Sequence, residues 1–191
     1  MIINRLESQD IKNILIFVCD SLRWDYIPVS ILNMGISTKT VASSLYTASS
    51  FPSIVSGLYP PKTGVHSWED LLPRNLRGLL EIDGYNSSLW CETTWTNLPP
   101  DKSAIHKVLG YPKGISLKEI DPPFIYIEDD KGGHCPYGLS FGEYMGKGCP
   151  NFYREYGKKG KKELIKQYRI GIQKSVENFK ERINILKEKQ N

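Results

Sequence analysis

The sequence predicts an α/β protein with a mostly parallel sheet flanked by helices. Short segments with the length of buried strands occur at residues 13–19, 85–91 and 123–128, and the first of them is a continuous apolar run. Helical patterns separate these segments, and a long amphipathic pattern follows the last one. Because strands that alternate with helices build parallel sheets, we expect the 191 residues to form a single domain over residues 1–191.

The first strand is predicted over residues 13–19, where the apolar run NILIFVC is rich in Ile and Val. The run stops at Asp20, which places this carboxylate at the carboxyl end of the strand. Ligands of open α/β sheets bind at this edge. Asp20 is therefore a candidate site residue from its position alone.

The middle of the chain predicts mixed structure. Residues 28–46 are expected to be irregular with a short helix, and a second short helix should run from about Ser50 to Gly57. The spacing of leucines predicts a helix over residues 71–82, which Asp83–Gly84 would stop. Residues 85–91 predict the second strand, and residues 92–122 a loop with one short helix.

The third strand is predicted over residues 123–128, and it ends in Glu128, Asp129 and Asp130. These acids could supply ligands, but we expect them to be solvated, as an acidic loop usually is. A loop over residues 131–151 follows. The last element is a long helix over about 161–188, which carries one apolar stripe. The stripe favours packing on the sheet over a coiled coil; it consists of Ile165, Tyr168, Ile172, Val176, Phe179, Ile183 and Leu186.

Composition narrows the class of protein. No apolar run approaches the ~20 residues that cross a bilayer, no signal peptide is visible, and the four cysteines lack a CxxC spacing. These features predict a cytoplasmic protein with reduced thiols and no membrane partner. The net charge of +4 comes partly from lysines between Lys158 and Arg169, which favour a solvated helix over nucleic-acid binding because no aromatic residues are interleaved among them.

Two segments carry residues suited to chemistry. A buried carboxylate such as Asp20 needs a neutralising partner, which is either a divalent metal ion or a cation such as Arg23. The hydroxyls from Thr47 to Ser50 precede a predicted helix, so they either cap it or provide a nucleophile that a metal activates. Each segment alone leaves both interpretations open.

Taken together, the segments resemble the sulfatase-like branch of the alkaline phosphatase superfamily. The resemblance rests on strand–Asp20–Ser21–Leu22–Arg23–x–Asp25, on Ser56-Gly57-Leu58-Tyr59-Pro60, and on His134-Cys135-Pro136-Tyr137 after the third strand. In that family a metal-binding Asp ends the first strand, and the nucleophile lies ten residues before the glycine, which here is Thr47. The resemblance implies an alkaline-phosphatase-like fold that is C-terminally truncated, because the Asp-His-Gly motif with further metal ligands does not occur.

The resemblance implies a metal-dependent hydrolase of small-molecule phosphate or sulfate esters. Asp20 and Thr47 would bind a divalent ion such as Zn, Mn or Ca, and Thr47 would attack the ester. Thr47 stands where sulfatases carry the formylglycine precursor, which favours a phosphate ester. The alternative is an inactive truncated remnant or a binding module that retains the N-terminal half of the fold, with an under-covered sheet that favours self-association.

Further residues are expected to bind the substrate: Arg23, Ser50, His66 and His134. Arg23 either binds an ester oxygen or pairs with Asp20 or Asp25, with the ion pair favoured slightly. His106 is expected to be a surface residue, and Cys19 a buried apolar one.

Overall fold

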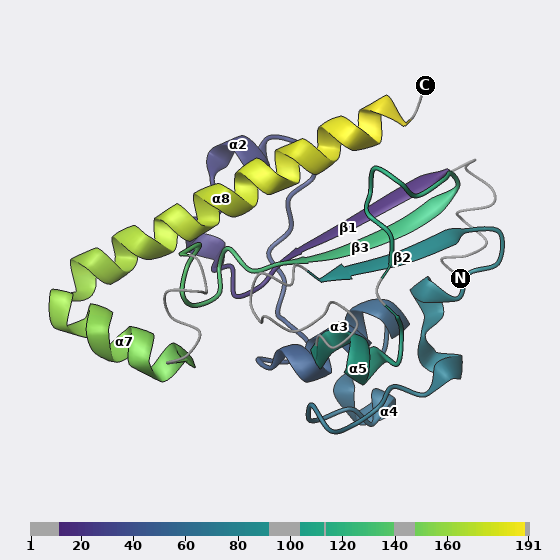
Figure 1. Cartoon of the computed structure of the whole chain (residues 1–191), viewed down its shortest axis with the longest axis horizontal. Coiled ribbons are helices and arrows are strands. Elements are labelled where there is room, and N and C mark those ends of the chain that lie inside the picture. The colour runs from purple at the N-terminus through teal and green to yellow at the C-terminus, as the bar shows by residue number, and fades with distance from the viewer. Residues whose placement is uncertain (1–11, 92–103, 113, 140–147, 190–191) are drawn as a thin grey trace.

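The three predicted strands form one parallel sheet (Figure 1). The computed structural model describes residues 12–91, 104–112, 114–139 and 148–189. Within these ranges the sheet has the order β1-β3-β2, with β1 at Asn13–Cys19, β2 at Asn86–Cys91 and β3 at Phe124–Asp130. The α/β class and the parallel sheet are therefore confirmed.

Helices lie on both faces of the sheet (Figure 1). The long helix α8 (Lys161–Glu188) crosses one face, and α3 (Thr47–Ser56) and α5 (Ala104–Leu109) lie on the other. Shorter elements connect these layers: η1 (Trp24–Tyr26), α2 (Val29–Leu32), α4 (Pro60–Thr63), η2 (Arg74–Leu76), η3 (Gly78–Leu80) and α7 (Gly148–Lys159).

Side chains of the central strand β3 alternate between two apolar clusters. Ile125 and Ile127 pack with Phe51 and Val55 of α3, whereas Phe124 and Tyr126 pack with the cluster that contains Ile185 of α8. Every residue of β3 is buried, as expected for a strand that has a neighbour on each side and a helical layer on each face.

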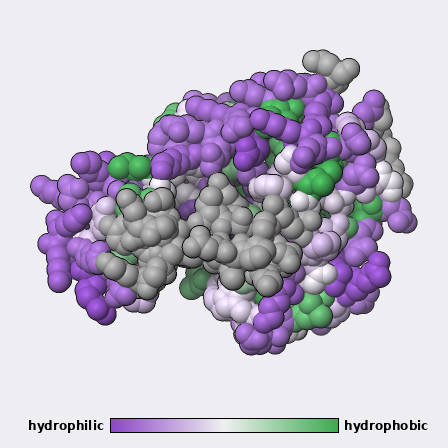
Figure 2. Space-filling view, viewed as in Figure 1, coloured by the Kyte–Doolittle hydropathy of each residue, from purple (hydrophilic) through white to green (hydrophobic). Residues whose placement is uncertain are grey.

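The stripe of α8 has the predicted use. Tyr168, Ile172, Val176 and Ile185 are buried, and the ring of Phe179 packs at 5.4 Å from that of Phe17 in β1. Figure 2 shows that the outer surface over α8 is largely hydrophilic. The helix therefore covers the sheet with one face and meets solvent with the other.

The helix predicted over residues 71–82 is wrong. Only the short 3-10 turns η2 and η3 form there. The backbone N–H of Leu72 donates a hydrogen bond to the carbonyl of Val108 in α5 at 2.7 Å, so it is not available for a helix of its own. Leu72 and Leu80 are both buried in the apolar cluster that contains α3. The chain turns between these two residues, so tertiary packing overrides the helical spacing of the leucines.

Four smaller predictions also need correction. Helix α3 begins at Thr47 rather than near Ser50, and α7 includes residues 148–151, which were predicted as the end of a loop. His106 is buried rather than on the surface, with Nδ1 hydrogen-bonded to the carbonyl of Tyr111 at 2.9 Å. The fourth concerns the acids at the end of β3, which are buried rather than solvated.

None of the helices in the described ranges has both the length and the apolar character that a bilayer crossing requires.

Candidate functional site at the carboxyl edge of the sheet

The strands β1 and β3 end side by side. Cys19 pairs with Asp130 in the register of the sheet, and the next amide, that of Asp20, donates to the carbonyl of Asp130 at 2.8 Å. The loop after β3 then returns against the loop after β1, where only a glycine fits, because a Cβ on Gly133 would lie 2.4 Å from the Asp20 carbonyl oxygen. Two loops thus meet at the edge where α/β proteins bind ligands.

An acid–lysine cluster occupies this edge. Lys131 Nζ lies 2.9 Å from Oδ2 of Asp20 and 2.5 Å from Oδ2 of Asp129. Asp129 is fully buried, and its Oδ1 has no hydrogen-bond partner among the described residues. The neutralising partner that Asp20 was expected to need is therefore Lys131, an amino acid that the sequence analysis did not single out.

Burial and charge act in opposite directions on these groups. Burial raises the pKa of Asp20, but the neighbouring Lys131 ammonium outweighs it and holds that pKa below its usual range. Burial dominates at Asp129 and raises its pKa to about 6 against the attraction of Lys131. Burial lowers the pKa of Lys131, yet the two carboxylates reverse the shift and raise it, so the ammonium stays charged.

The predicted divalent metal stays a prediction. In the part of the chain that the structure describes, no group of three or more His, Cys, Asp or Glu side chains is placed to hold a metal ion. The carboxylates of Asp20 and Asp129 share the Lys131 ammonium, whereas a hard cation takes six or more oxygen ligands. The described residues by themselves therefore do not fit such an ion.

The other two acids of β3 face α8 and are fully paired. Glu128 accepts two hydrogen bonds from Arg182, from Nε at 2.8 Å and Nη2 at 3.0 Å. Asp130 accepts from Ser175, from Asn178 at 2.7 Å and from the Gly132 amide at 2.9 Å. These acids attach α8 to the sheet, so we assign them to the architecture rather than to chemistry.

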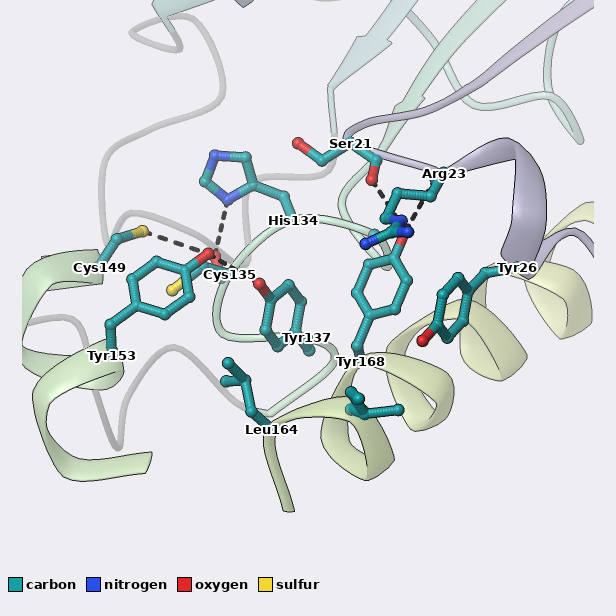
Figure 3. A pocket seen from close by; sticks show the side chains of 12 residues that line it. Ser21, Arg23, Tyr26, His134, Cys135, Tyr137, Cys149, Tyr153, Leu164 and Tyr168 are labelled. Carbon is teal, nitrogen blue, oxygen red and sulfur yellow. Dashed lines mark hydrogen bonds between the residues drawn. The ribbon is translucent and has the colours of Figure 1, made fainter. Parts of the chain in front are cut away.

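A pocket opens beside the cluster, on the loops that follow β1 and β3 (Figure 3). Its volume is about 390 Å³, within the range of roughly 300–1,000 Å³ that small-molecule sites occupy. The loop after β1, the loop after β3 and helices α7 and α8 supply its walls, with Ser21, Arg23, His134, Cys135, Cys149 and four tyrosines among the lining residues.

The four tyrosines stand in a row from α7 to the loop after β1 (Figure 3). Ring centroids are 6.3 Å apart between Tyr153 and Tyr137, 5.1 Å between Tyr137 and Tyr168, and 5.0 Å between Tyr168 and Tyr26, all edge to face. The Tyr168 hydroxyl donates to the Ser21 carbonyl at 3.0 Å and accepts from the Arg23 amide at 2.8 Å. Helix α8 thereby fixes the start of the loop after β1.

His134 lies on the pocket wall with a defined tautomer. Its Nδ1 is 2.7 Å from the carbonyl oxygen of Cys135, and because a carbonyl only accepts, Nδ1 must donate. The neutral ring then keeps its lone pair on Nε2. The Cys149 thiol donates weakly to the same carbonyl at 3.9 Å, and all four cysteines are free thiols, as predicted.

Arg23 also lines the pocket, and the favoured ion pair is confirmed with Asp25 rather than Asp20. Its Nε and Nη2 bond the two carboxylate oxygens of Asp25 at 3.0 and 2.7 Å. Cys19 is half-buried under α8, where its sulfur lies 3.0 Å from the hydroxyl oxygen of Ser175. Burial raises the pKa of its thiol to about 11, so it behaves as a structural residue.

The other three predicted site residues are not among the residues that line this pocket. Thr47 opens α3, and no hydrogen bond links it to Asp20 among the described residues. The Ser50 hydroxyl donates to the Ser44 carbonyl at 3.0 Å, and His66 is exposed in a turn where its amide donates to Asp70 at 2.8 Å. The structure brings together Asp20, Arg23 and His134 around two loops, whereas the roles of Thr47, Ser50 and His66 stay predictions.

Sequence reasoning missed the residues that complete the site. Lys131 could have been inferred from a strand that ends in acids and is followed directly by a lysine, whereas Asp129 was named but expected to be solvated. Tyr153 carried no signal, since no helix was predicted for the segment that forms α7. Tyr168 was assigned to the apolar stripe, and its hydroxyl gave no hint that it fixes a loop 147 residues away.

The fold and the site define an α/β protein whose parallel sheet carries an acid–lysine cluster and a tyrosine-rich pocket at its carboxyl edge. No protein-family model matches the chain, and no solved structure does, so no particular fold family is assigned. The chain is similar to the low-salt glycan biosynthesis sulfotransferase Agl7 of Haloferax volcanii, with 34% identity over 170 residues. This similarity covers 89% of the chain and 41% of the relative, so the chain spans about two fifths of that protein's length.

This comparison overturns the functional prediction. The relative is named as a sulfotransferase, which transfers a group instead of hydrolysing an ester. The assignment to the sulfatase-like branch and the expected phosphate- or sulfate-ester hydrolase are therefore wrong, and the alternative of an inactive remnant gains no support. The error came from motifs that describe the sheet edge and its polar loops, because such an edge is compatible with several reactions.

Proposed function

We propose that the chain is part of a sulfotransferase that acts in glycan biosynthesis. The observation that carries this proposal is the 34% identity to a protein of that name over 89% of the chain. The pocket at the carboxyl edge of β1 and β3 supports it, because a transferase must hold a donor and an acceptor together at one place. Its substrates would be an activated sulfate donor and a sugar hydroxyl.

The proposed reaction moves one sulfuryl group. The oxygen of a sugar hydroxyl attacks sulfur and forms a new S–O bond, while the S–O bond to the donor breaks and the donor's leaving group departs with the electron pair. The proton of the hydroxyl must pass to a base. The products are a sulfated sugar and the desulfated donor.

His134 is the residue suited to accept that proton. It lines the pocket, and the hydrogen bond from Nδ1 to the Cys135 carbonyl fixes the tautomer in which Nε2 carries the lone pair. General-base catalysis by a positioned histidine typically contributes about 10²–10⁴-fold in rate. In this proposal Asp20, Asp129 and Lys131 keep the two loops in place and set the local field.

The proposal is tested by incubating the protein with radiolabelled 3′-phosphoadenylyl sulfate or p-nitrophenyl sulfate as the donor and a panel of oligosaccharides as acceptors. We expect label on the sugar and a mass gain of one sulfuryl group. The release of p-nitrophenol from p-nitrophenyl sulfate should depend on the acceptor. Donor cleavage at the same rate without any acceptor, or no sulfated sugar with either donor, contradicts the proposal.

The role of His134 has a separate test. The variant His134→Ala should lose about 10²-fold or more of the transfer rate, and added imidazole should restore part of it. Tyr59→Ala, at a tyrosine that is 73% exposed and outside the pocket, should transfer at the original rate. A loss in His134→Ala that imidazole does not restore would assign His134 to structure instead of proton transfer.

A further inference from the structure

The tyrosine row and the cations around it point to a particular ligand. We propose that this pocket binds a sugar that carries a carboxylate, as one unit of the glycan acceptor; this inference rests on the proposed function. The hydroxyl-bearing aromatic wall would hold the sugar ring, and Arg23 would pair with its carboxylate.

The aromatic wall suits a sugar ring. Sugars present C–H groups on their faces, which pack on the electron-rich faces of aromatic rings. Tyr153 offers the accessible ring, since it is 44% exposed while still lining the pocket. Tyr137 packs edge to face against Tyr153, with ring centroids 6.3 Å apart, and Tyr168 packs in the same way against Tyr137 at 5.1 Å. A wall that is already ordered loses little entropy when a ligand arrives.

Hydroxyl groups of the same wall suit the polar rim of a sugar. The hydroxyls of Tyr137 and Tyr153 are 2.7 Å apart, so one donates to the other, and the pair keeps one O–H and its lone pairs for a ligand. Burial raises the pKa of both Tyr137 and Tyr153, so both hydroxyls stay protonated at neutral pH. A flat nucleotide base matches this wall less well, because the rings stand edge to face rather than parallel.

Positive charge lies beside the wall. The Arg23 guanidinium uses Nε and Nη2 on Asp25 and keeps further N–H donors. The guanidinium carbons of Arg23 and Arg169 lie 5.2 and 5.7 Å from the ring centre of Tyr26. Beyond Ile165, which lines both spaces, a second hollow of about 590 Å³ is lined by Lys162, Lys166 and Arg169.

These cations also explain the basic run between residues 158 and 169. Sequence reasoning favoured a solvated helix for it. In the structure it forms the end of α7 and the first turns of α8, directly beside the tyrosine row. An anionic group on the sugar, and further acidic units along the same glycan, would meet this charge.

The probes for the test are sodium glucuronate, glucose and adenosine 3′,5′-bisphosphate, each titrated into the full chain and followed by saturation-transfer NMR. We expect saturable binding of glucuronate, with weaker binding of glucose. In Tyr153→Ala the affinity for glucuronate should fall about five- to tenfold. Tyr59→Ala, an exposed tyrosine away from the pocket, should bind as the original protein does.

The carboxylate has its own variant pair. Arg23→Gln should lower the affinity for glucuronate about threefold and leave that for glucose unchanged. Arg74→Gln removes a comparably exposed arginine that pairs with Glu81 at 3.6 Å, and should change neither. Equal effects of the two arginine variants, or glucuronate binding unchanged in Tyr153→Ala, would overturn the inference.

The outcomes separate this inference from the proposed function. Sulfuryl transfer to neutral sugars without glucuronate binding would keep the function and overturn the acidic-sugar site. Glucuronate binding that depends on Tyr153 and Arg23, without any transfer, would keep the site and refute the function. Binding of the bisphosphate alone, lost in Tyr153→Ala, would make the pocket a donor site and overturn the inference.

Discussion

The acids on the two sides of strand β3 differ in how completely their carboxylates are hydrogen-bonded. On the α8 side, Glu128 and Asp130 have partners for both carboxylate oxygens, in Arg182 and in Ser175, Asn178 and the Gly132 amide. On the opposite side, Asp129 shares one lysine with Asp20 and keeps an oxygen without a hydrogen bond among the described residues. Adjacent acids of one strand therefore differ. Glu128 and Asp130 attach α8 to the sheet, whereas Asp129 lacks a full set of hydrogen-bond partners among the described residues.

The difference suggests where function lies. Groups that hold a fold together are satisfied by fixed partners, whereas functional sites retain unsatisfied or strongly shifted groups. Asp129, with its raised pKa, belongs to the second kind, and the loops that it borders also form the tyrosine pocket.

The largest effect is expected when Lys131 is removed. Lys131→Met leaves Asp20 and the buried Asp129 without their shared cation, which should lower the free energy of unfolding by about 3–5 kcal/mol in urea titrations. Adding Asp129→Asn to this variant should recover part of the loss. An unfolding midpoint equal to that of the original protein would show that the cluster carries no energetic coupling.

On the other side, Arg182→Met leaves Glu128, which is 1% exposed, without its bidentate partner. The expected loss is again about 3–5 kcal/mol, and Glu128→Gln in the same chain should offset it in part. Because neither Glu128 nor Arg182 lines the pocket, ligand binding by the folded fraction should not change. A loss of binding at temperatures where the variant is folded would contradict the architectural assignment.

The third prediction concerns pH. The pKa of Asp129 is about 6 in the folded chain and near 4 when unfolded, so its contribution to stability is present below pH 4 and is lost as the pH rises through 6. The size is up to about 3 kcal/mol. Relative to the original protein, Asp129→Asn should therefore gain stability between pH 4.5 and 7 in guanidinium titrations. If the difference in the free energy of unfolding between the two proteins does not vary with pH, the pKa of Asp129 is not raised in the folded chain.

A smaller effect is expected for Asn178→Ala. It removes one hydrogen bond of 2.7 Å to Asp130 but leaves Ser175 and the Gly132 amide in place. The free energy of unfolding should fall by about 1.5–3 kcal/mol. Thermal unfolding of this variant is compared with that of Asn151→Ala, which changes a half-buried asparagine of α7. A larger loss in Asn178→Ala would show that the effect comes from the attachment of α8 to the sheet.

The smallest effect on stability is expected for Arg23→Gln. The Arg23–Asp25 pair is exposed, with side chains 66% and 57% accessible, and such pairs contribute little. The unfolding temperature should not change measurably, although the discrimination between glucuronate and glucose should decrease. A lowered unfolding temperature would mean that Arg23 holds the loop after β1, which we assign to Tyr168.

Much of the fold could be predicted because it depends on local patterns. The strand at residues 13–19 has its predicted bounds, and helix α8 spans the predicted 161–188. The helix expected over residues 71–82 failed because Leu72 hydrogen-bonds to Val108 of the α5 segment, a contact that no local pattern contains.

The candidate site was predicted only in part. Asp20, Arg23 and His134 do lie on the two loops at the sheet edge, since the end of an apolar run marks the end of a strand. Thr47 was singled out by a resemblance, and the comparison with a sulfotransferase corrected the reaction that the resemblance implied. Residue types at an edge indicate that a ligand binds there, but they do not select the reaction.

The sequence by itself determined the strands, the stripe of α8 and the position of a carboxylate at a strand end, because periodicity and apolar runs act over a few neighbouring residues. Only the tertiary structure decided that Lys131 joins Asp20 to Asp129, that Tyr168 holds the loop at Ser21, and that tyrosines from α7, α8 and two loops form one row. These contacts depend on strand register and on helix packing, and both are set by burial across the whole chain.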